Sequence, residues 1–210
     1  MAIKIALAGN PNCGKTTMFN ALTGANQYVG NWPGVTVEKK EGKLKGKKGK
    51  GEDIIVTDLP GIYSLSPYTL EEVVSRDYVL KENPDVIIDL VDATNIERNL
   101  YLTTQLIETG VPVVIALNMA DLLEKRGIKI DTKRLSMLLD CPIIETSALR
   151  GEGLDKLIDE AVKVAKSSKV DLPKEIFSKD MEAAIDEVKG VLPTSVTDDK
   201  KRWYAVKFLE

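Results

Sequence analysis

The stretch GNPNCGKT, residues 9–16, decides the fold of this 210-residue chain. It matches the pattern G-x-x-x-x-G-K-[ST], follows a short apolar run and opens a helical pattern, which is the context of a phosphate-binding loop. Glycine-permitted backbone turns successive N–H groups around phosphate oxygens, and the following helix adds the positive end of its dipole. We therefore expect Lys15 on the β- and γ-phosphates and the Thr16 hydroxyl on Mg²⁺.

Apolar runs alternate with helical patterns on both sides of this loop. Buried strands are predicted at residues 3–8, 54–57, 86–91, 113–117 and, after a proline, 143–144. Helices are predicted at 15–22, 70–81, 98–109 and 154–166. Residues 35–44 and the lysine-rich turn after them predict a hairpin, and hence one antiparallel strand. The pattern is that of an α/β fold with a largely parallel sheet.

The chain changes character after residue 166. Residues 167–174 read as a linker, and residues 175–210 carry two patterns of helical spacing, the second of which begins near Thr197. We expect a first domain at 1–166 and a small helical domain at 175–210. Roughly 40 residues are few for an independent core.

The composition excludes several classes of function. The chain has no histidine, which removes histidine metal sites, bases and triads, and its net charge of −3 gives no field that would attract nucleic acid. The two cysteines fit a reducing compartment better than a disulfide framework. We see no signal peptide and no apolar run near the ~20 residues of a membrane span, so a soluble chain is expected. A lysine run is favoured as a solvated hairpin tip over a phosphate or lipid patch; it comprises Lys43, Lys45, Lys47, Lys48 and Lys50.

The segment DLPGIYSL, residues 58–65, follows the predicted strand at 54–57. Asp58 can hold Mg²⁺ through water, and the Gly61 N–H can meet a γ-phosphate. Alone, D-x-x-G is typical of any turn, but at this distance after a phosphate-binding loop it is informative. Ile62 occupies the position at which many nucleotide hydrolases place a water-orienting glutamine, so the chain either lacks hydrolysis or handles the water differently.

Two further segments favour guanine. In LNMAD, residues 117–121, the carboxylate of Asp121 can accept two hydrogen bonds from guanine that adenine cannot donate. Met119 stands where a lysine is usual, and it can cover the base without charge. The segment TSALRGEG, residues 146–153, fits a loop whose backbone N–H contacts the guanine oxygen. In isolation, each segment also fits a helix N-cap.

These four motifs, in this order, resemble the TRAFAC-class small GTPases over about residues 1–166. The resemblance implies a Ras-like, six-stranded sheet with one antiparallel strand. Within YVGNWPGVTVEKKEG, residues 28–42, Thr36 would be the switch I residue that closes on Mg²⁺ and the γ-phosphate. The segment GNWPGVT, together with GNPN, DLPGIYSL and DATNIERNLYLTTQL, closely resembles the N-terminal cytoplasmic domain of the FeoB family of prokaryotic ferrous-iron transporters.

The FeoB resemblance implies a G domain and a small helical domain on the cytoplasmic side of the inner membrane. Its partners would be GTP or GDP and a membrane domain of the same polypeptide, with homo-oligomers possible. The resemblance also implies K⁺ where an arginine finger would lie. The potassium-binding asparagine of the family maps onto Asn12, and backbone carbonyls around Gly30 and Trp32 would complete the site. An amide oxygen and phosphate oxygens form a hard cage that suits such a cation.

The expectation is thus a GTPase that depends on Mg²⁺ and is stimulated by K⁺. Its catalytic residues would be Asn12, Lys15, Thr36 and Gly61, and its Mg²⁺ ligands Thr16, Thr36 and, through water, Asp58. The expected GTP-binding residues are Asn10, Pro11, Asn12, Cys13, Gly14, Lys15, Thr16, Thr17, Gly34, Val35, Thr36, Asp58, Gly61, Asn118, Met119, Asp121, Ser147, Ala148 and Leu149. Two alternatives remain open: a soluble K⁺-dependent GTPase of ribosome or tRNA maturation, and a GTP-dependent binding module that does not hydrolyse.

Overall fold

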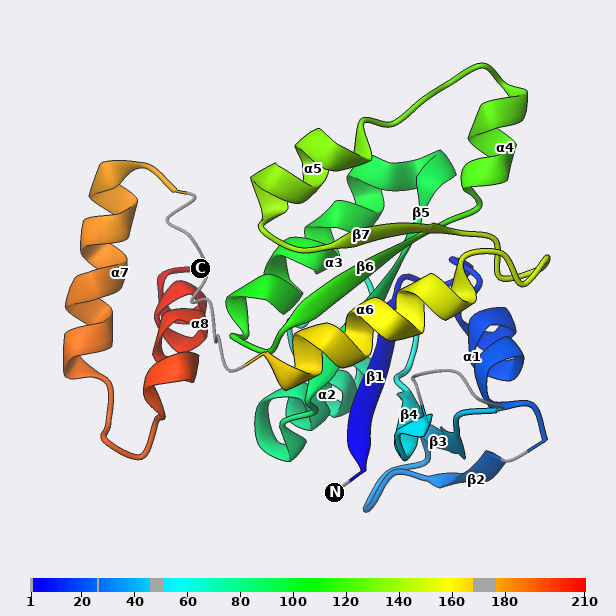
Figure 1. Ribbon diagram of the computed structural model, residues 1–210. Coiled ribbons are helices and arrows are strands. Elements are labelled where there is room, and N and C mark those ends of the chain that lie inside the picture. Colours follow the sequence, from blue (N-terminus) through cyan, green and yellow to red (C-terminus); the bar gives the residue numbers. More distant parts are fainter. Residues whose placement is uncertain (1, 26, 46–50, 168–176) are drawn as a thin grey trace.

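The computed structural model describes residues 2–25, 27–45, 51–167 and 177–210 (Figure 1). Seven strands form one sheet in the order β2-β3-β4-β1-β5-β6-β7. They are β1 (Ile3–Gly9), β2 (Gln27–Asn31), β3 (Glu38–Lys43), β4 (Ile54–Asp58), β5 (Val86–Asp92), β6 (Val113–Asn118) and β7 (Ile143–Thr146). Strand β3 runs antiparallel to its two neighbours, and the remaining pairs are parallel. The predicted α/β sheet with one reversed strand is confirmed.

The expected number of six strands is wrong, because the edge strand β2 was not predicted. Its sequence QYVGN buries no residue, and Tyr28 and Val29 are exposed. Such a strand has no apolar face from which to predict it; it forms because its backbone pairs with β3, with Val29 opposite Lys40. The predicted hairpin is present as the antiparallel pair β3–β4. Its proposed tip at residues 46–50 lies outside the described residues.

Helices cover both faces of the sheet, because alternate residues of each strand point to opposite sides (Figure 1). Ile5 and Leu7 of β1 pack with α1 (Lys15–Thr23) and α6 (Leu154–Lys166). Ala6 and Ala8 of the same strand face the side covered by α2 (Leu70–Asp77) and α3 (Ile96–Glu108). These helices were predicted, except that the 70–81 pattern ends as a π-helix, η2 (Tyr78–Glu82), and that the short helix η3 (Ala93–Asn95) precedes α3.

Two short helices were not predicted: α4 (Ala120–Lys125) and α5 (Thr132–Leu139). Helix α5 is only eight residues long and buries no residue fully, although Leu135, Leu138 and Leu139 stand at helical spacing and the Asp131 side chain caps it by accepting from Arg134 N–H. The C-terminal region contains α7 (Lys179–Val191) and α8 (Asp198–Leu209), as the spacing predicted, with Thr197 as the N-cap residue of α8. The division into domains at 167–174 stays a prediction, since residues 168–176 lie outside the described ranges.

Helix α8 attaches the C-terminal region to the sheet domain through a buried ion cluster. The Arg202 guanidinium donates to Glu108 of α3 at 2.8 Å and to Glu182 of α7 at 2.7 Å, and all three side chains are at most 10% exposed. Lys200 donates to Asn83 at 3.0 Å. Charges removed from water need such partners, so this contact fixes the positions of α3, α7 and α8 relative to one another. Within the described ranges, no helix is long and apolar enough to cross a bilayer.

Candidate functional site

The loop of residues 9–16 connects β1, in the middle of the sheet, to α1, and its backbone has the curvature of an anion site. Asn12 has φ 68° and Gly14 has φ 94°, both in the left-handed region. Gly14 is the N-cap residue of α1 and offers no side chain to the first N–H groups of the helix. A Cβ at Gly14 would lie 2.5 Å from Asn118 Nδ2, so glycine is required there. The helix start is therefore open to an anion.

Lys15, the lysine expected on the phosphates, contacts Asp58 at the end of β4. Lys15 Nζ lies 2.6 Å from Asp58 Oδ1, and both side chains are nearly buried. Burial raises the pKa of the Asp58 carboxyl, and the Lys15 ammonium opposes that rise. Thr16, the next residue on α1, carries a hydroxyl, so the residue after Lys15 and its ion-pair partner Asp58 both offer oxygen ligands. These are the hard ligands that Mg²⁺ prefers, and Mg²⁺ commonly binds through one or two carboxylates and the substrate phosphates. The residues present fit Mg²⁺.

The DLPG loop (residues 58–65) lies directly against the phosphate-binding loop. Ile62 N–H donates to Gly9 O at 3.3 Å, and a Cβ at Gly61 would come 3.3 Å from Pro11 Cα. Ile62 itself is 3% exposed and belongs to an apolar cluster that includes Trp32 and Leu65. The residue in the glutamine position is therefore a core residue, which holds the loop in place and has no polar side-chain atom to orient a water.

Switch I (residues 28–42) is folded as the β2–β3 hairpin, with Thr36 exposed in the connecting turn. Trp32 is 8% exposed and packs edge-on against Tyr78 at a centroid distance of 5.3 Å. The Trp32 carbonyl accepts from Val35 N–H at 3.2 Å, and Gly30 is paired with Lys39 in the ladder. Both segments expected to complete a K⁺ site are thus engaged in the hairpin.

Asn12 is the part of the expected K⁺ site that stands free. Its side chain is exposed and makes no hydrogen bond within the described residues. Its amide oxygen fits a monovalent cation. Neighbouring Cys13 is buried, and burial raises the pKa of its thiol to about 12, so the reactive thiolate is disfavoured.

Asn118, at the end of β6, joins three loops. Its Nδ2 donates to Cys13 O at 2.9 Å, and its Oδ1 accepts from Ala148 N–H at 3.0 Å and from Thr146 Oγ1 at 3.4 Å. The next residue, Met119, has φ 62°, and its Cε lies 3.7 Å from a Cβ built on Gly14. The residues proposed for the phosphates and for the base are therefore parts of one site.

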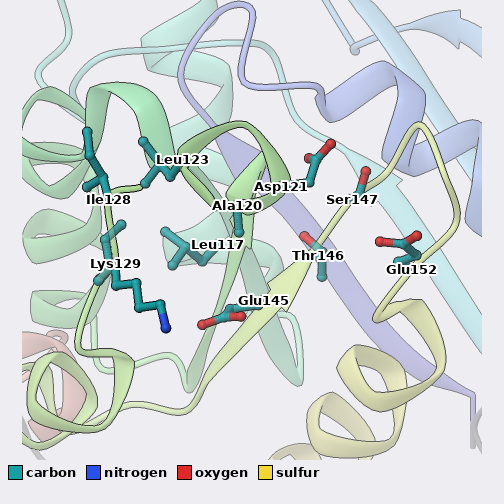
Figure 2. A pocket seen from close by; sticks show the side chains of 11 residues that line it. Leu117, Ala120, Asp121, Leu123, Ile128, Lys129, Glu145, Thr146, Ser147 and Glu152 are labelled. Atoms are coloured by element: carbon teal, nitrogen blue, oxygen red, sulfur yellow. The ribbon is translucent and has the colours of Figure 1, made fainter. Parts of the chain in front are cut away.

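The carboxylate proposed for guanine has a partner that sequence reasoning missed. Asp121 Oδ2 lies 3.4 Å from Arg150 Nη2, which comes from the loop after β7. Asp121 and Ser147 also line a cavity of about 370 Å³ beside β6 and β7 (Figure 2), with Lys129 and Glu145 at its other end. Ser147 and Ala148 are buried, whereas Leu149 is 88% exposed. The only signal for Arg150 in the sequence was its position within the expected guanine loop, directly after Leu149.

One protein-family model, described as "Ferrous iron transport protein B", matches residues 3–161. The chain belongs to the FeoB family. It is 41% identical over 212 residues to the Fe(2+) transporter FeoB of Escherichia coli K12. The match covers 99% of this chain and 27% of that protein. It is 44% identical over 217 residues to the Fe(2+) transport protein A/Fe(2+) transporter FeoB fusion protein of Porphyromonas gingivalis, and the match covers 99% of this chain and 25% of that protein. The chain spans about a quarter of the length of these curated relatives.

Solved structures of FeoB cytosolic domains share the fold. An S. thermophilus NFeoB mutant bound to mGDP superimposes with a TM-score of 0.93 at 52% identity, covering 99% of this chain and 78% of that one. The cytosolic domain of T. maritima FeoB in apo form gives 0.90 at 40% identity, covering 100% of this chain and 81% of that one. The sheet described above is therefore that of a FeoB G domain, with a P-loop nucleotide-binding architecture.

Proposed function

We propose that this chain binds GTP and hydrolyses it to GDP and phosphate, as the G domain of a ferrous-iron transport protein. The observation that carries the proposal is the position of Asn118, whose amide connects the phosphate-binding loop to the guanine loops. Relatives of the chain are named as Fe(2+) transporters, and several structures in the family contain guanine nucleotides. Two nucleotide-binding motifs joined by one buried side chain support a single ligand that spans both.

Each group near the phosphates has a role that follows from its chemistry. The backbone N–H groups of residues 12–16 and the Lys15 ammonium bind the phosphate oxygens. Thr16, Thr36 and, through water, Asp58 would hold Mg²⁺, which neutralises charge on the β- and γ-phosphates. For Lys15 to reach the phosphates, it exchanges its contact with Asp58 for phosphate oxygens. Gly61 offers its N–H to the γ-phosphate, and Thr36 moves in from the hairpin turn.

Base recognition follows from the loops on the other side of Asn118. Asp121 accepts from the guanine N1–H and 2-amino groups, releasing Arg150 to solvent. Because the Ala148 N–H already bonds Asn118, the N–H of Leu149 is the donor left for the guanine oxygen. Met119 covers one face of the base with its apolar side chain.

Without a glutamine at position 62, we propose that K⁺ substitutes for a positive finger beside the phosphates. Asn12 would hold it through its amide oxygen, together with backbone carbonyls of Gly30 and Trp32. A cation at this point stabilises negative charge that develops in the transition state. Since the Trp32 carbonyl accepts from Val35 in the hairpin, switch I rearranges when the site forms.

We propose further that the domain works on the cytoplasmic side of the inner membrane, where its partner is a membrane domain of the same polypeptide and ferrous iron is the cargo. Hydrolysis would release Thr36 and Gly61 and so change the surface offered to that partner. The relatives, of which this chain spans about a quarter, support this context. Association into homo-oligomers is compatible with it, and nucleic acid has no part in it.

The test is single-turnover hydrolysis of GTP and of ATP, with Mg²⁺ in K⁺ buffer and with EDTA. We expect GDP and phosphate from GTP only, and only with Mg²⁺. Tight GTP binding without turnover would point to the non-hydrolysing binding module, and equal turnover of ATP would remove the guanine assignment. Thr104→Ala is the control for activity lost during preparation of a variant, because the Thr104 hydroxyl donates to Tyr101 O within α3 and makes no other hydrogen bond among the described residues.

A further inference from the structure

One face of α3 holds the DLPG loop at two points. Leu65 N–H donates to Gln105 Oε1 at 2.7 Å, and Ser64 Oγ donates to the same oxygen at 3.2 Å. Seven residues earlier on α3, the Arg98 guanidinium carbon lies 4.1 Å from the centroid of the Tyr63 ring. Residues seven apart stand two turns apart on the same side of a helix. The three consecutive residues after Ile62 are therefore bound to one helical face.

Gln105 acts on the loop as a hydrogen-bond acceptor. A backbone N–H can only donate, so the atom that meets Leu65 is the side-chain oxygen. Gln105 is 8% exposed and Leu65 is fully buried, and the Gln105 Nε2 has no partner among the described residues. A buried N–H that loses its acceptor is costly, so this contact strongly favours the observed loop conformation.

The same face also reaches the phosphate-binding loop. Asn10 is 3% exposed, and its Nδ2 donates to the Arg98 backbone carbonyl at 3.5 Å. On the loop itself, Ile62 N–H bonds Gly9 O, and Gly61 packs against Pro11. The start of α3 thus contacts both the loop that follows β1 and the loop that follows β4. Gly61 lies in the second loop, which is held at Ile62 by its bond to Gly9 and at Leu65 by its bond to Gln105.

We propose that Gln105 and Arg98 are positioning residues for GTP hydrolysis, which hold residues 61–65 so that the Gly61 N–H stays where a γ-phosphate would meet it. The inference rests on the proposed GTPase function. The Gly61 contact strengthens as negative charge develops on the γ-phosphoryl oxygens in the transition state, and GDP has no γ-phosphate. Loosening the loop therefore lowers turnover of GTP and leaves GDP affinity unchanged.

The first test uses Gln105→Leu, which keeps the volume and removes the acceptor, and Gln105→Glu, which keeps an acceptor oxygen before the same two donors. For Gln105→Leu we expect kcat for GTP to fall roughly 5- to 30-fold, the cost of re-ordering about one residue of backbone, with KM and GDP Kd within about 2-fold. Gln105→Glu should keep kcat within about 3-fold of the parent value. Arg98→Ala should cost about 2- to 5-fold, and Arg98→Lys less, because exposed cation–π contacts are weak.

The second readout is hydrogen exchange of the Leu65 amide, followed by NMR without nucleotide. It should accelerate in Gln105→Leu, stay slow in Gln105→Glu, and stay slow in the neighbouring control Thr104→Ala. An unchanged kcat in Gln105→Leu, or a Gln105→Glu as impaired as Gln105→Leu, would overturn the proposal. If Gln105→Leu does not fold, the variant of the exposed Arg98 still tests the proposal. A kcat in Arg98→Ala equal to that of the parent would overturn it. A parent without hydrolysis but with a Leu65 amide protected by Gln105 would instead refute the GTPase function alone.

Discussion

The Lys15 ammonium lies 2.6 Å from the Asp58 carboxylate, and so connects the phosphate-binding loop to the end of β4. The two side chains are 11% and 7% exposed, so this ion pair is largely removed from water. Both groups are also the ones proposed for phosphate and Mg²⁺. Under the proposed function, nucleotide and Mg²⁺ would replace this ion pair, and the protein without nucleotide leaves neither charge unpaired.

The pair predicts a separation between stability and binding. Lys15→Met should lower the free energy of unfolding of the nucleotide-free protein by about 3 kcal/mol, because it leaves Asp58 buried and unpaired. The double variant Lys15→Met/Asp58→Asn should recover most of that loss, yet neither protein should bind a fluorescent GDP analogue. Urea unfolding and fluorescence titration measure the two effects.

The exposed pair of Lys81 and Asp77 provides a matched control, since Lys81 is 70% exposed. Lys81→Met should change the free energy of unfolding by at most about 1 kcal/mol. If the double variant Lys15→Met/Asp58→Asn were as unstable as Lys15→Met, the loss of stability would not come from the unpaired Asp58 carboxylate.

Asp121 predicts the base specificity. Asp121→Asn should weaken GTP binding on the order of 10²-fold or more and favour xanthosine nucleotides, because the amide replaces one of the two accepting carboxylate oxygens by an NH2 donor, which matches the 2-oxo group of xanthine. Competition between GTP and XTP for the site measures the preference. Arg150→Ala removes the partner of Asp121 in the free protein and should leave the preference for guanine intact. An unchanged preference in Asp121→Asn would remove the guanine assignment.

Asn12 predicts a dependence on the monovalent cation. GTP hydrolysis should be faster in K⁺ than in Na⁺ at equal ionic strength by at least ~10-fold, a small part of the 10³–10⁵ that an arginine finger supplies. Asn12→Ala should lose that difference while it retains GDP binding. Equal rates in the two salts for the parent, or full K⁺ stimulation in Asn12→Ala, would contradict the proposed site.

Asp89 predicts a pH dependence of stability. It is 1% exposed, accepts from Thr103 Oγ1 at 2.5 Å, and burial raises the pKa of its carboxyl from 3.8 to about 6. Between pH 4 and pH 6 the unfolded chain loses the proton while the folded chain keeps it, so stability falls as pH rises. Above pH 6 the cost is complete, on the order of 3 kcal/mol for two pKa units.

Asp89→Asn keeps an acceptor for Thr103 and removes the charge. It should be more stable than the parent at pH 7.5 and equal to it below pH 4, as measured by urea unfolding at both values. Asp186→Asn, on the exposed face of α7, should show a difference of no more than ~0.5 kcal/mol at either pH. The same difference between Asp89→Asn and the parent at both values would exclude titration of Asp89 as the cause.

Those parts of the fold that bury a periodic apolar face could be predicted from sequence. The pattern of α6 has Leu154, Leu157, Ile158, Ala161 and Val162 on one side, and the helix has the predicted bounds and buries those residues. Strand β2 buries nothing, so its backbone pairing with β3 decides it and no local pattern does. Helix α5 has leucines at helical spacing and an Asp131 N-cap, which are local signals that the sequence prediction overlooked. The π-helix at 78–82 keeps the helical spacing of α2, and differs in hydrogen bonding that spacing does not reveal.

The motif residues follow the same division. Local chemistry was enough to place Gly9, Gly14 and Lys15 in a phosphate-binding loop, because left-handed backbone and a helix N-terminus are properties of adjacent residues. Distant partners needed the fold. Arg150 beside Asp121, Arg202 between two glutamates, and Gln105 on the loop after Ile62 are 20 or more residues from at least one partner.

Ile62 shows the physical reason. Its sequence position says only that no polar side chain can orient water there. Its burial beside Trp32 and Leu65, and the bond from its N–H to Gly9, show that it anchors the loop against the sheet. Order along the chain specified which motifs are present, since each works through neighbouring atoms. Packing across the sheet specified which side chains hold those motifs in register, because contacts between remote residues exist only once the strands have paired.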